Sequence, residues 1–146
     1  MNPITSEPWL LWALLSAGFA ALTAIFAKTG MAGVGSDYAT FVRTIVILLS
    51  IGAILLVRGG WQAPNSVSAR SYVFLVLSGL ATGASWLCYF RALKIGDAAR
   101  VAPIDKLSVV LVAVFGVIFL GERLSGPNWL GVALIGTGAI LVAWRG

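Results

Sequence analysis

The stretch that decides the fold class lies between Ala102 and Leu120 and reads APIDKLSVVLVAVFGVIFL. It is apolar over most of its length and long enough to cross a bilayer, because a spanning helix needs about 20 mostly apolar residues. Two charged residues, Asp105 and Lys106, nevertheless stand inside it. A charge in hydrocarbon is unfavourable by a few kcal/mol even on the mildest insertion scales, so we expect these two residues to serve function.

Four more apolar stretches of similar length accompany this one. Together the five predict transmembrane helices over approximately residues 9–27, 38–57, 72–90, 102–120 and 129–144. Of the 146 residues, 60% are hydrophobic and 10% are charged, whereas a soluble domain has about 25% charged residues. The connections are short, so we expect one all-α integral membrane domain over residues 1–146, surrounded by the lipid bilayer.

The composition argues against several classes of function. The chain has no His and a single cysteine, Cys88, so a disulfide framework, a zinc site and a His-containing catalytic triad are excluded within one chain. We therefore expect no enzyme, no metal and no cofactor. The net charge of +5 comes from scattered basic residues, mostly at the ends of the apolar stretches. This is the usual membrane-protein pattern, and it predicts no nucleic-acid partner.

Five spans place the two termini on opposite sides of the membrane. The N-terminal side, side A, carries three basic residues, and the opposite side, side B, carries five. These are Arg58, Arg70 and Arg123 on side A, and Lys28, Arg91, Lys94, Arg100 and Arg145 on side B. The positive-inside rule needs a clear excess, so side B is only slightly favoured as cytoplasmic, and insertion in both orientations stays open.

The second apolar stretch also holds a charge, Arg43. It lies six residues after Asp37, and Asp105 lies five residues after Arg100. Both are therefore roughly 8–9 Å inward from side B at 1.5 Å per residue, and we expect them to meet. They form either a structural ion pair, with Lys106 reaching back to side B, or a substrate or proton site, which we favour. Two cations against one anion favour a carboxylate or phosphate on the substrate, with Asp105 as the proton-coupling group.

Three further residues are candidates for the same site. Trp86 and Tyr89 lie toward side B, level with the charges, where they would either stack on a ligand or pack against a neighbouring helix. Ser108 lies one turn from Asp105 on the same expected helix. Pro103 either opens that helix near its N-terminus, which we favour, or leaves a backbone defect beside the charges.

Three motifs together resemble a known family. They are YFRALKIGDAARVAPIDKLS over residues 89–108, FLGERLS over 119–125, and GVALIGTG over 131–138. In combination, they resemble the EamA domain of the drug/metabolite transporter superfamily, in its short five-helix form. Typical members have ten helices in two inverted repeats and export amino acids and other metabolites. A chain with one repeat then implies an antiparallel homodimer, with each copy inserted in the opposite orientation.

The last motif implies where two copies would meet. Its pattern, formed by Gly131, Leu134, Ile135 and Gly138, is similar to the last helix of the small multidrug resistance proteins, which packs their dimer. Glycines seven residues apart allow close helix approach. Those proteins carry an essential Glu in helix 1, whereas here the nearest acid, Glu7, precedes the first apolar stretch.

The expected function is a multi-pass secondary transporter in the cytoplasmic membrane of a prokaryote. It would export a small polar or anionic metabolite, such as an amino acid, by alternating access. The expected site consists of Arg43, Trp86, Tyr89, Asp105, Lys106 and Ser108. A non-transporting subunit or scaffold and a cation exporter similar to the small multidrug resistance proteins are the alternatives. A parallel dimer or a heterodimer also stays open.

Overall fold

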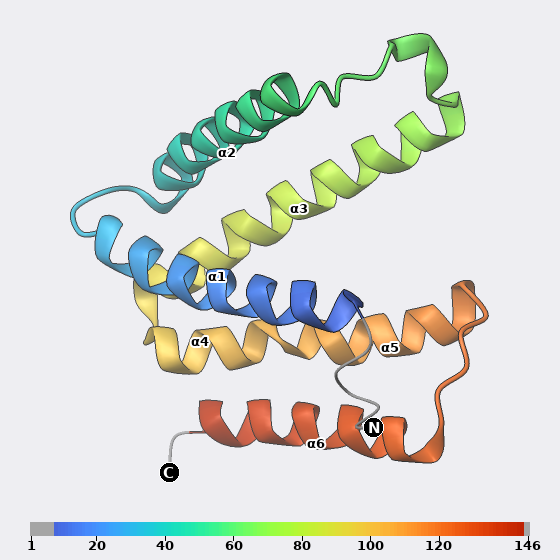
Figure 1. The fold of residues 1–146 in the computed structure, drawn as a ribbon. Helices are drawn as coiled ribbons and strands as arrows, with labels where there is room; N and C mark the ends of the chain where they lie inside the picture. The colour runs from blue at the N-terminus through green and yellow to red at the C-terminus, as the bar shows by residue number, and fades with distance from the viewer. Residues whose placement is uncertain (1–7, 145–146) are drawn as a thin grey trace. The chain divides into compact units, whose positions relative to one another are not determined.

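A computed structural model describes residues 8–144, and every regular element in that range is helical (Figure 1). The elements are α1 (Pro8–Gly30), α2 (Ser36–Arg58), the short 3₁₀ helix η1 (Pro64–Ser66), α3 (Ala69–Ile95), α4 (Ala98–Asp105), α5 (Leu107–Phe119) and α6 (Gly126–Ala143). Five helical spans are long and apolar enough to cross a membrane, the fourth being α4 and α5 together. The predicted all-α fold with five spans is confirmed. Glu7 and Arg145 lie outside the described residues.

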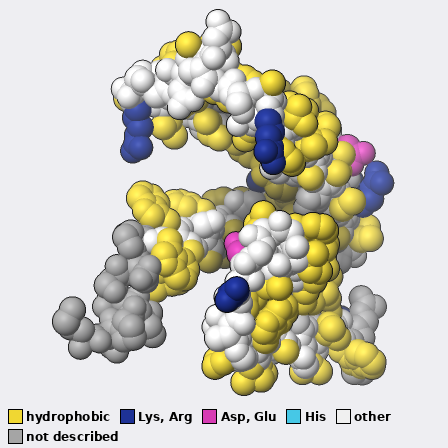
Figure 2. Space-filling view, turned by 90° about the vertical axis from the view of Figure 1, so that its right-hand side faces the viewer, with side chains coloured by type: hydrophobic (Ala, Val, Ile, Leu, Met, Phe, Trp, Pro, Cys, Tyr) yellow, Lys and Arg dark blue, Asp and Glu magenta, His cyan; other side chains and the backbone are white. Residues whose placement is uncertain are grey.

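Hydrophobic side chains cover most of the helical surface, and charged side chains are few (Figure 2). Large residues such as Trp12, Leu48 and Phe119 are mostly exposed. In water, such a surface would drive association. In a bilayer it is the expected outer surface, because lipid tails are as apolar as these side chains.

The chain divides into two compact units. We call residues 26–94 the central unit and residues 1–25 with 95–146 the terminal unit. Within the terminal unit, α6 packs against both α4 and α5. A Cβ added at Gly136 of α6 would lie 3.3 Å from a methyl group of Val110. Glycine at this position therefore permits a close approach of the two helices.

The buried residues of the central unit gather where α1 ends, α2 begins and α3 ends. They are Ala27, Met31, Ser36, Thr40, Phe90 and Leu93. Two lysine side chains connect these segments through hydrogen bonds to backbone carbonyls. The Lys28 ammonium donates to the Leu93 carbonyl at 2.6 Å, and the Lys94 ammonium donates to the Val34 carbonyl at 2.8 Å. The carbonyls in the last turn of a helix lack intrahelical partners. The hydrogen bond from Lys28 to the Leu93 carbonyl therefore caps α3.

The opposite end of α2 closes on a glycine turn. Gly59 has φ of 60°, the left-handed region that glycine adopts without steric strain. The amide of Gly60 donates to the Leu55 carbonyl at 2.9 Å, and that of Gly59 to the Leu56 carbonyl at 3.3 Å. This pair of bonds is the Schellman arrangement, which satisfies the last carbonyls of a helix.

The fourth span differs most from its prediction. It starts at Ala98 rather than near Ala102, and it is interrupted at Lys106, which separates α4 from α5. Pro103 lies inside α4, so the favoured interpretation, that it opens the helix, is wrong. Proline supplies no amide donor to the preceding turn. Beyond it, the Lys106 amide bonds to the Pro103 carbonyl at 3.0 Å, a three-residue spacing typical of a tightened turn.

Candidate functional site

Arg43 of α2 lies against an aromatic surface of α3. Its guanidinium carbon is 4.3 Å from the centroid of the Phe90 ring and 5.4 Å from that of Trp86. Both distances are within the roughly 6 Å range of a cation–π interaction. Trp86 and Phe90 are four residues apart and so share one helical face. Phe90 is only 1% exposed, so its ring is packed on all sides.

The charge of Arg43 has no counter-ion within the central unit. Its Nη1 atom is buried and has no hydrogen-bond partner among the described residues. The unit has one acidic residue, Asp37, and its carboxylate pairs with Arg91 at 3.3 Å. A guanidinium stays charged at all ordinary pH values, and a buried N–H donor without a hydrogen-bond partner is unfavourable. The position therefore favours an anion beside Arg43.

Tyr89 belongs to the same cluster. Its ring meets that of Phe90 edge-on, with centroids 5.6 Å apart. The structure thus brings together Arg43, Trp86 and Tyr89, and it adds Phe90. The sequence alone did not indicate Phe90 as a site residue, because a phenylalanine in an apolar stretch is common. Its spacing of four from Trp86, at the depth of Arg43, was the available clue.

Asp105 and Lys106 lie in the terminal unit, at the interruption between α4 and α5. The Lys106 ammonium is 3.3 Å from a carboxylate oxygen of Asp105. The side chains are 55% and 35% exposed, respectively, so each can reach solvent or a ligand. Consecutive side chains on a regular helix point in different directions, and here they meet where the helix is broken. Ser108, the second residue of α5, is exposed. Because Arg43 belongs to the other unit, its pairing with Asp105 stays a prediction.

In transporters, an interrupted spanning helix often forms part of the binding site. A break exposes backbone carbonyls of the first half-helix and amides of the second, and both can contact substrate or coupling ions. Here the interruption falls at Lys106, with Asp105 as its neighbour. The charged pair therefore lies where the helix of the fourth span is interrupted, and the backbone there still bonds from the Lys106 amide to the Pro103 carbonyl and from the Val109 amide to the Lys106 carbonyl.

The predicted interface residues share one face of α6. Gly131, Leu134, Ile135 and Gly138 follow the three- and four-residue steps of a helical face. Leu134 and Ile135 are exposed, and a Cβ added at either glycine would meet nothing within 4 Å. Gly136, which faces Val110 of α5, lies on the other side of the helix. The four residues are thus not used in packing α6 to α5, and their role in pairing two copies stays a prediction.

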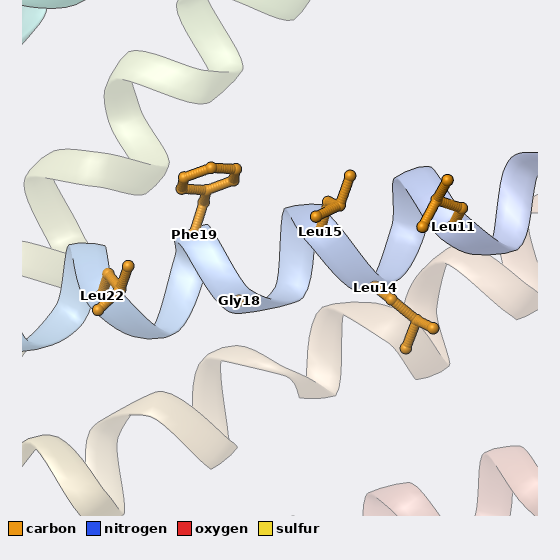
Figure 3. Close-up of a pocket in the computed structure, with 6 residues that line it drawn as sticks. All are labelled: Leu11, Leu14, Leu15, Gly18, Phe19 and Leu22. Carbon is orange, nitrogen blue, oxygen red and sulfur yellow. The ribbon is translucent and has the colours of Figure 1, made fainter.

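An apolar hollow follows α1 along residues Leu11, Leu14, Leu15, Gly18, Phe19 and Leu22 (Figure 3). Its lining side chains carry no polar group. Leu11, Leu15 and Phe19 project to one side of the helix, and Leu14 to the other. Such a surface suits lipid tails or another helix. It offers nothing that would orient a polar substrate.

Comparison with known proteins identifies the family. The EamA-like transporter family matches residues 7–144. This chain belongs to that family. The chain is therefore a multi-pass membrane protein of a transporter family, with a small-molecule substrate implied, and not of an enzyme family. The predicted membership is confirmed. No solved structure matches the chain.

Several named proteins are similar in sequence to this chain. A Sinorhizobium protein, described as an uncharacterized transporter in the cobO 3′ region, is 64% identical over 94% of this chain and 98% of its own length. A riboflavin transporter of Rhizobium johnstonii is 27% identical over 95% of this chain, but over only 47% of its own length. A Proteus mirabilis protein is 27% identical over 73% of this chain and 98% of its own. It is described as a probable 4-amino-4-deoxy-L-arabinose-phosphoundecaprenol flippase subunit, ArnE.

These lengths separate two kinds of EamA relative. This chain covers nearly the whole of the Sinorhizobium and Proteus proteins, and about half of the riboflavin transporter. The EamA unit therefore occurs both as a short chain and within chains about twice as long.

Proposed function

We propose that this chain is a secondary transporter that exports a small polar or anionic metabolite, with amino acids as the simplest candidates. Two copies, inserted in opposite orientations in a prokaryotic cytoplasmic membrane, would form the working transporter. Family membership and the match to half of a longer transporter support this pairing. The nearly balanced charges of sides A and B support it as well, because a chain that inserts both ways cannot carry a strong positive-inside bias.

The proposal of an anionic substrate rests on Arg43, whose Nη1 atom is buried without a hydrogen-bond partner and whose guanidinium lies against the ring of Phe90. The guanidinium carbon lies over the Phe90 ring at 4.3 Å from its centroid, and the N–H donors of the guanidinium would bind the ligand. Those donors match a carboxylate or a phosphate, which Arg binds in bidentate fashion. Trp86 and Tyr89 would pack beside the bound anion.

Asp105, Lys106 and Ser108 would complete the site. Lys106 would give the substrate a second positive contact, and Ser108 a hydrogen bond. Asp105 would then lose its ammonium partner and could accept a proton, which would couple transport to a proton gradient. The interruption at Lys106 supports this assignment, since discontinuous helices near the midplane mark the sites of many transporters. Rocking of the two halves around the site would give alternating access.

A second function has one observation in its favour. The ArnE relative is described as a flippase subunit, so a short EamA chain can be one part of a larger assembly. This chain would then be a membrane subunit that packs against another protein, and its charges would be structural. A cation exporter of the small multidrug resistance type is less well supported, because α1 carries no acidic residue.

Ligand binding and transport distinguish these functions. We would screen the purified protein in detergent for thermal stabilisation by L-amino acids, succinate, citrate and inorganic phosphate, since a ligand specific for the folded state raises apparent stability. The radiolabelled form of any stabilising compound would then be followed by counterflow in proteoliposomes.

The variants test the role of Arg43 in this assay. We expect Arg43→Gln to abolish both stabilisation and counterflow, and Arg43→Lys to weaken both, because lysine keeps the charge without the planar fork. Arg58→Gln, at the end of α2, is the matched control. Equal ligand stabilisation and counterflow in Arg43→Gln and the wild type would show that Arg43 does not bind the substrate. Absence of stabilisation by every compound in a well-folded sample would favour the subunit function.

A further inference from the structure

One end of the central unit gathers positive charge. Lys28, Arg91 and Lys94 lie there with a single acidic residue, Asp37, and we call these four residues the basic end. Lys28 is in the last turn of α1, and Lys94 is in the last turn of α3. Asp37 is in the first turn of α2. All four residues therefore lie at the ends of spanning helices, the depth at which lipid headgroups are found.

Two of the three cations of the basic end, Lys28 and Lys94, are held in place. The ammonium groups of Lys28 and Lys94 each donate to a backbone carbonyl, at 2.6 and 2.8 Å. A lysine ammonium has three N–H donors, so its bond to the Val34 carbonyl leaves Lys94 able to contact a further acceptor. Fixed cations lose less conformational entropy on binding than free side chains would.

Asp37 neutralises only part of this charge. Its carboxylate lies 3.3 Å from the guanidinium of Arg91, and the two side chains are 62% and 69% exposed. An exposed ion pair of this kind contributes little stability, so another anion can displace the carboxylate. Within the central unit, the three cations of the basic end against one carboxylate leave an uncompensated positive charge, and in the segment that follows, Asp97 is matched in number by Arg100.

We propose that the basic end is a binding site for the phosphate of an anionic phospholipid headgroup. Arg91 and Lys94 would contact the phosphate, and Asp37 would compete with it for Arg91. A lipid fits better than free phosphate because Tyr38 and Phe41, which follow Asp37 into the span, are exposed apolar residues. They would lie along the acyl chain, with the tyrosine hydroxyl at the interface, where that residue is enriched. This site does not depend on the transport proposal.

Lipid binding should stabilise the central unit. The lysines of the basic end already connect the ends of α1 and α3 and the turn before α2. A phosphate held between Arg91 and Lys94 would add a further contact to this arrangement. A ligand that binds only the folded state raises the apparent stability by an amount that grows with the logarithm of its concentration relative to its dissociation constant.

The test compares lipids and variants on the purified full chain. Dioleoyl phosphatidylglycerol or dioleoyl phosphatidylcholine would be titrated into detergent, with melting temperature and lipid adducts in native mass spectra as the readouts. Arg91→Gln and Arg70→Gln are matched, since both remove one positive charge from α3, at opposite ends. Asp37→Asn tests the competition. A further arm uses inorganic phosphate at the same concentration as the lipid.

We expect phosphatidylglycerol, but not phosphatidylcholine, to raise the melting temperature through Arg91; any stabilisation by inorganic phosphate should be the same in Arg91→Gln and the wild type. Each basic residue near an anionic lipid surface contributes on the order of a fivefold change in binding. Arg91→Gln should therefore raise the half-saturating lipid concentration about fivefold, Arg70→Gln should leave it unchanged, and Asp37→Asn should lower it.

Three results would overturn the site. Equal losses in Arg91→Gln and Arg70→Gln would indicate attraction to the overall charge. Equal stabilisation by inorganic phosphate that is lost in Arg91→Gln would indicate a free-anion site at the basic end. An unchanged or weaker response in Asp37→Asn would contradict the competition at Arg91, and this variant keeps the test decisive if Arg91→Gln fails to fold.

Discussion

The α6 helix offers a test of the proposed pairing, because its glycines lie on two different faces. In the double variant Gly131→Ala/Gly138→Ala, the added methyl groups meet nothing within 4 Å in the described chain. Alanine is favoured over glycine in a helix interior by roughly 0.8–1.0 kcal/mol per residue in water. The individual copy should therefore fold at least as well as the wild type.

The same methyl groups would obstruct a dimer that packs on this face. Small residues at a helix–helix contact in a membrane let the backbones approach closely, and overpacking a well-packed contact costs about 1–3 kcal/mol. Each site should then weaken association by roughly 5- to 150-fold. Gly136→Ala is the matched control on the same helix. Its methyl group would lie 3.3 Å from Val110, so it should strain the contact with α5 and leave pairing unchanged.

The assay measures pairing and folding separately. Energy transfer between donor- and acceptor-labelled copies in liposomes, over a range of protein-to-lipid ratios, reports association, and the melting temperature in detergent reports the fold. Labels would be attached at one introduced cysteine in a Cys88→Ser background. Wild-type association in Gly131→Ala/Gly138→Ala would refute the assignment of this face. So would a loss of association in Gly136→Ala as large as that in the double variant.

Two further predictions concern the cap of α2 and the orientation of the chain. Gly59→Ala should lower the free energy of unfolding by about 1–2 kcal/mol, because Gly59 has φ of 60° and other residues are strained in that region. Gly52→Ala, inside the same helix with open space around it, should leave stability unchanged or raise it, and thermal unfolding of both checks the contrast. Single cysteines at each terminus, in a Cys88→Ser background, should react with a membrane-impermeant reagent from both sides of the membrane. Labelling of each terminus from one side only would exclude the antiparallel homodimer.

The spans were predictable because hydropathy and length determine them, but their ends were not. The third helix was predicted to end near Phe90, and α3 continues through Arg91 and Lys94 to Ile95. Hydropathy assigns these charged residues to a connection. They remain helical because lysine and arginine can extend their charged groups to the membrane surface, and here Lys94 and Arg91 also bond to the α1–α2 turn and to Asp37.

The charged candidates for the site could be named from the sequence, but their surroundings could not. An ionisable residue in an apolar stretch stands out, so Arg43, Asp105 and Lys106 were all predicted as site residues, and their role stays a prediction. The aromatic surface under Arg43 depends on which face of α3 meets α2, and hydropathy says nothing of that. Pro103 indicated that the helix could be interrupted near the charges. Because proline disturbs the backbone over a full turn, the sequence does not give the exact position of the break at Lys106.

The two units divide the chemistry of the proposed site unequally. The central unit supplies one cation, Arg43, with no acidic partner of its own. The terminal unit supplies the neutral pair of Asp105 and Lys106. A site built from both would carry one excess positive charge, which a single carboxylate or phosphate neutralises. Binding of that anion to Lys106 would release Asp105 as a carboxylate, and the three side-chain charges and the anion would then sum to zero. One singly charged anion per cycle is therefore the stoichiometry that this set of charges favours, because a proton taken up by Asp105 while the anion is bound would leave the site positively charged.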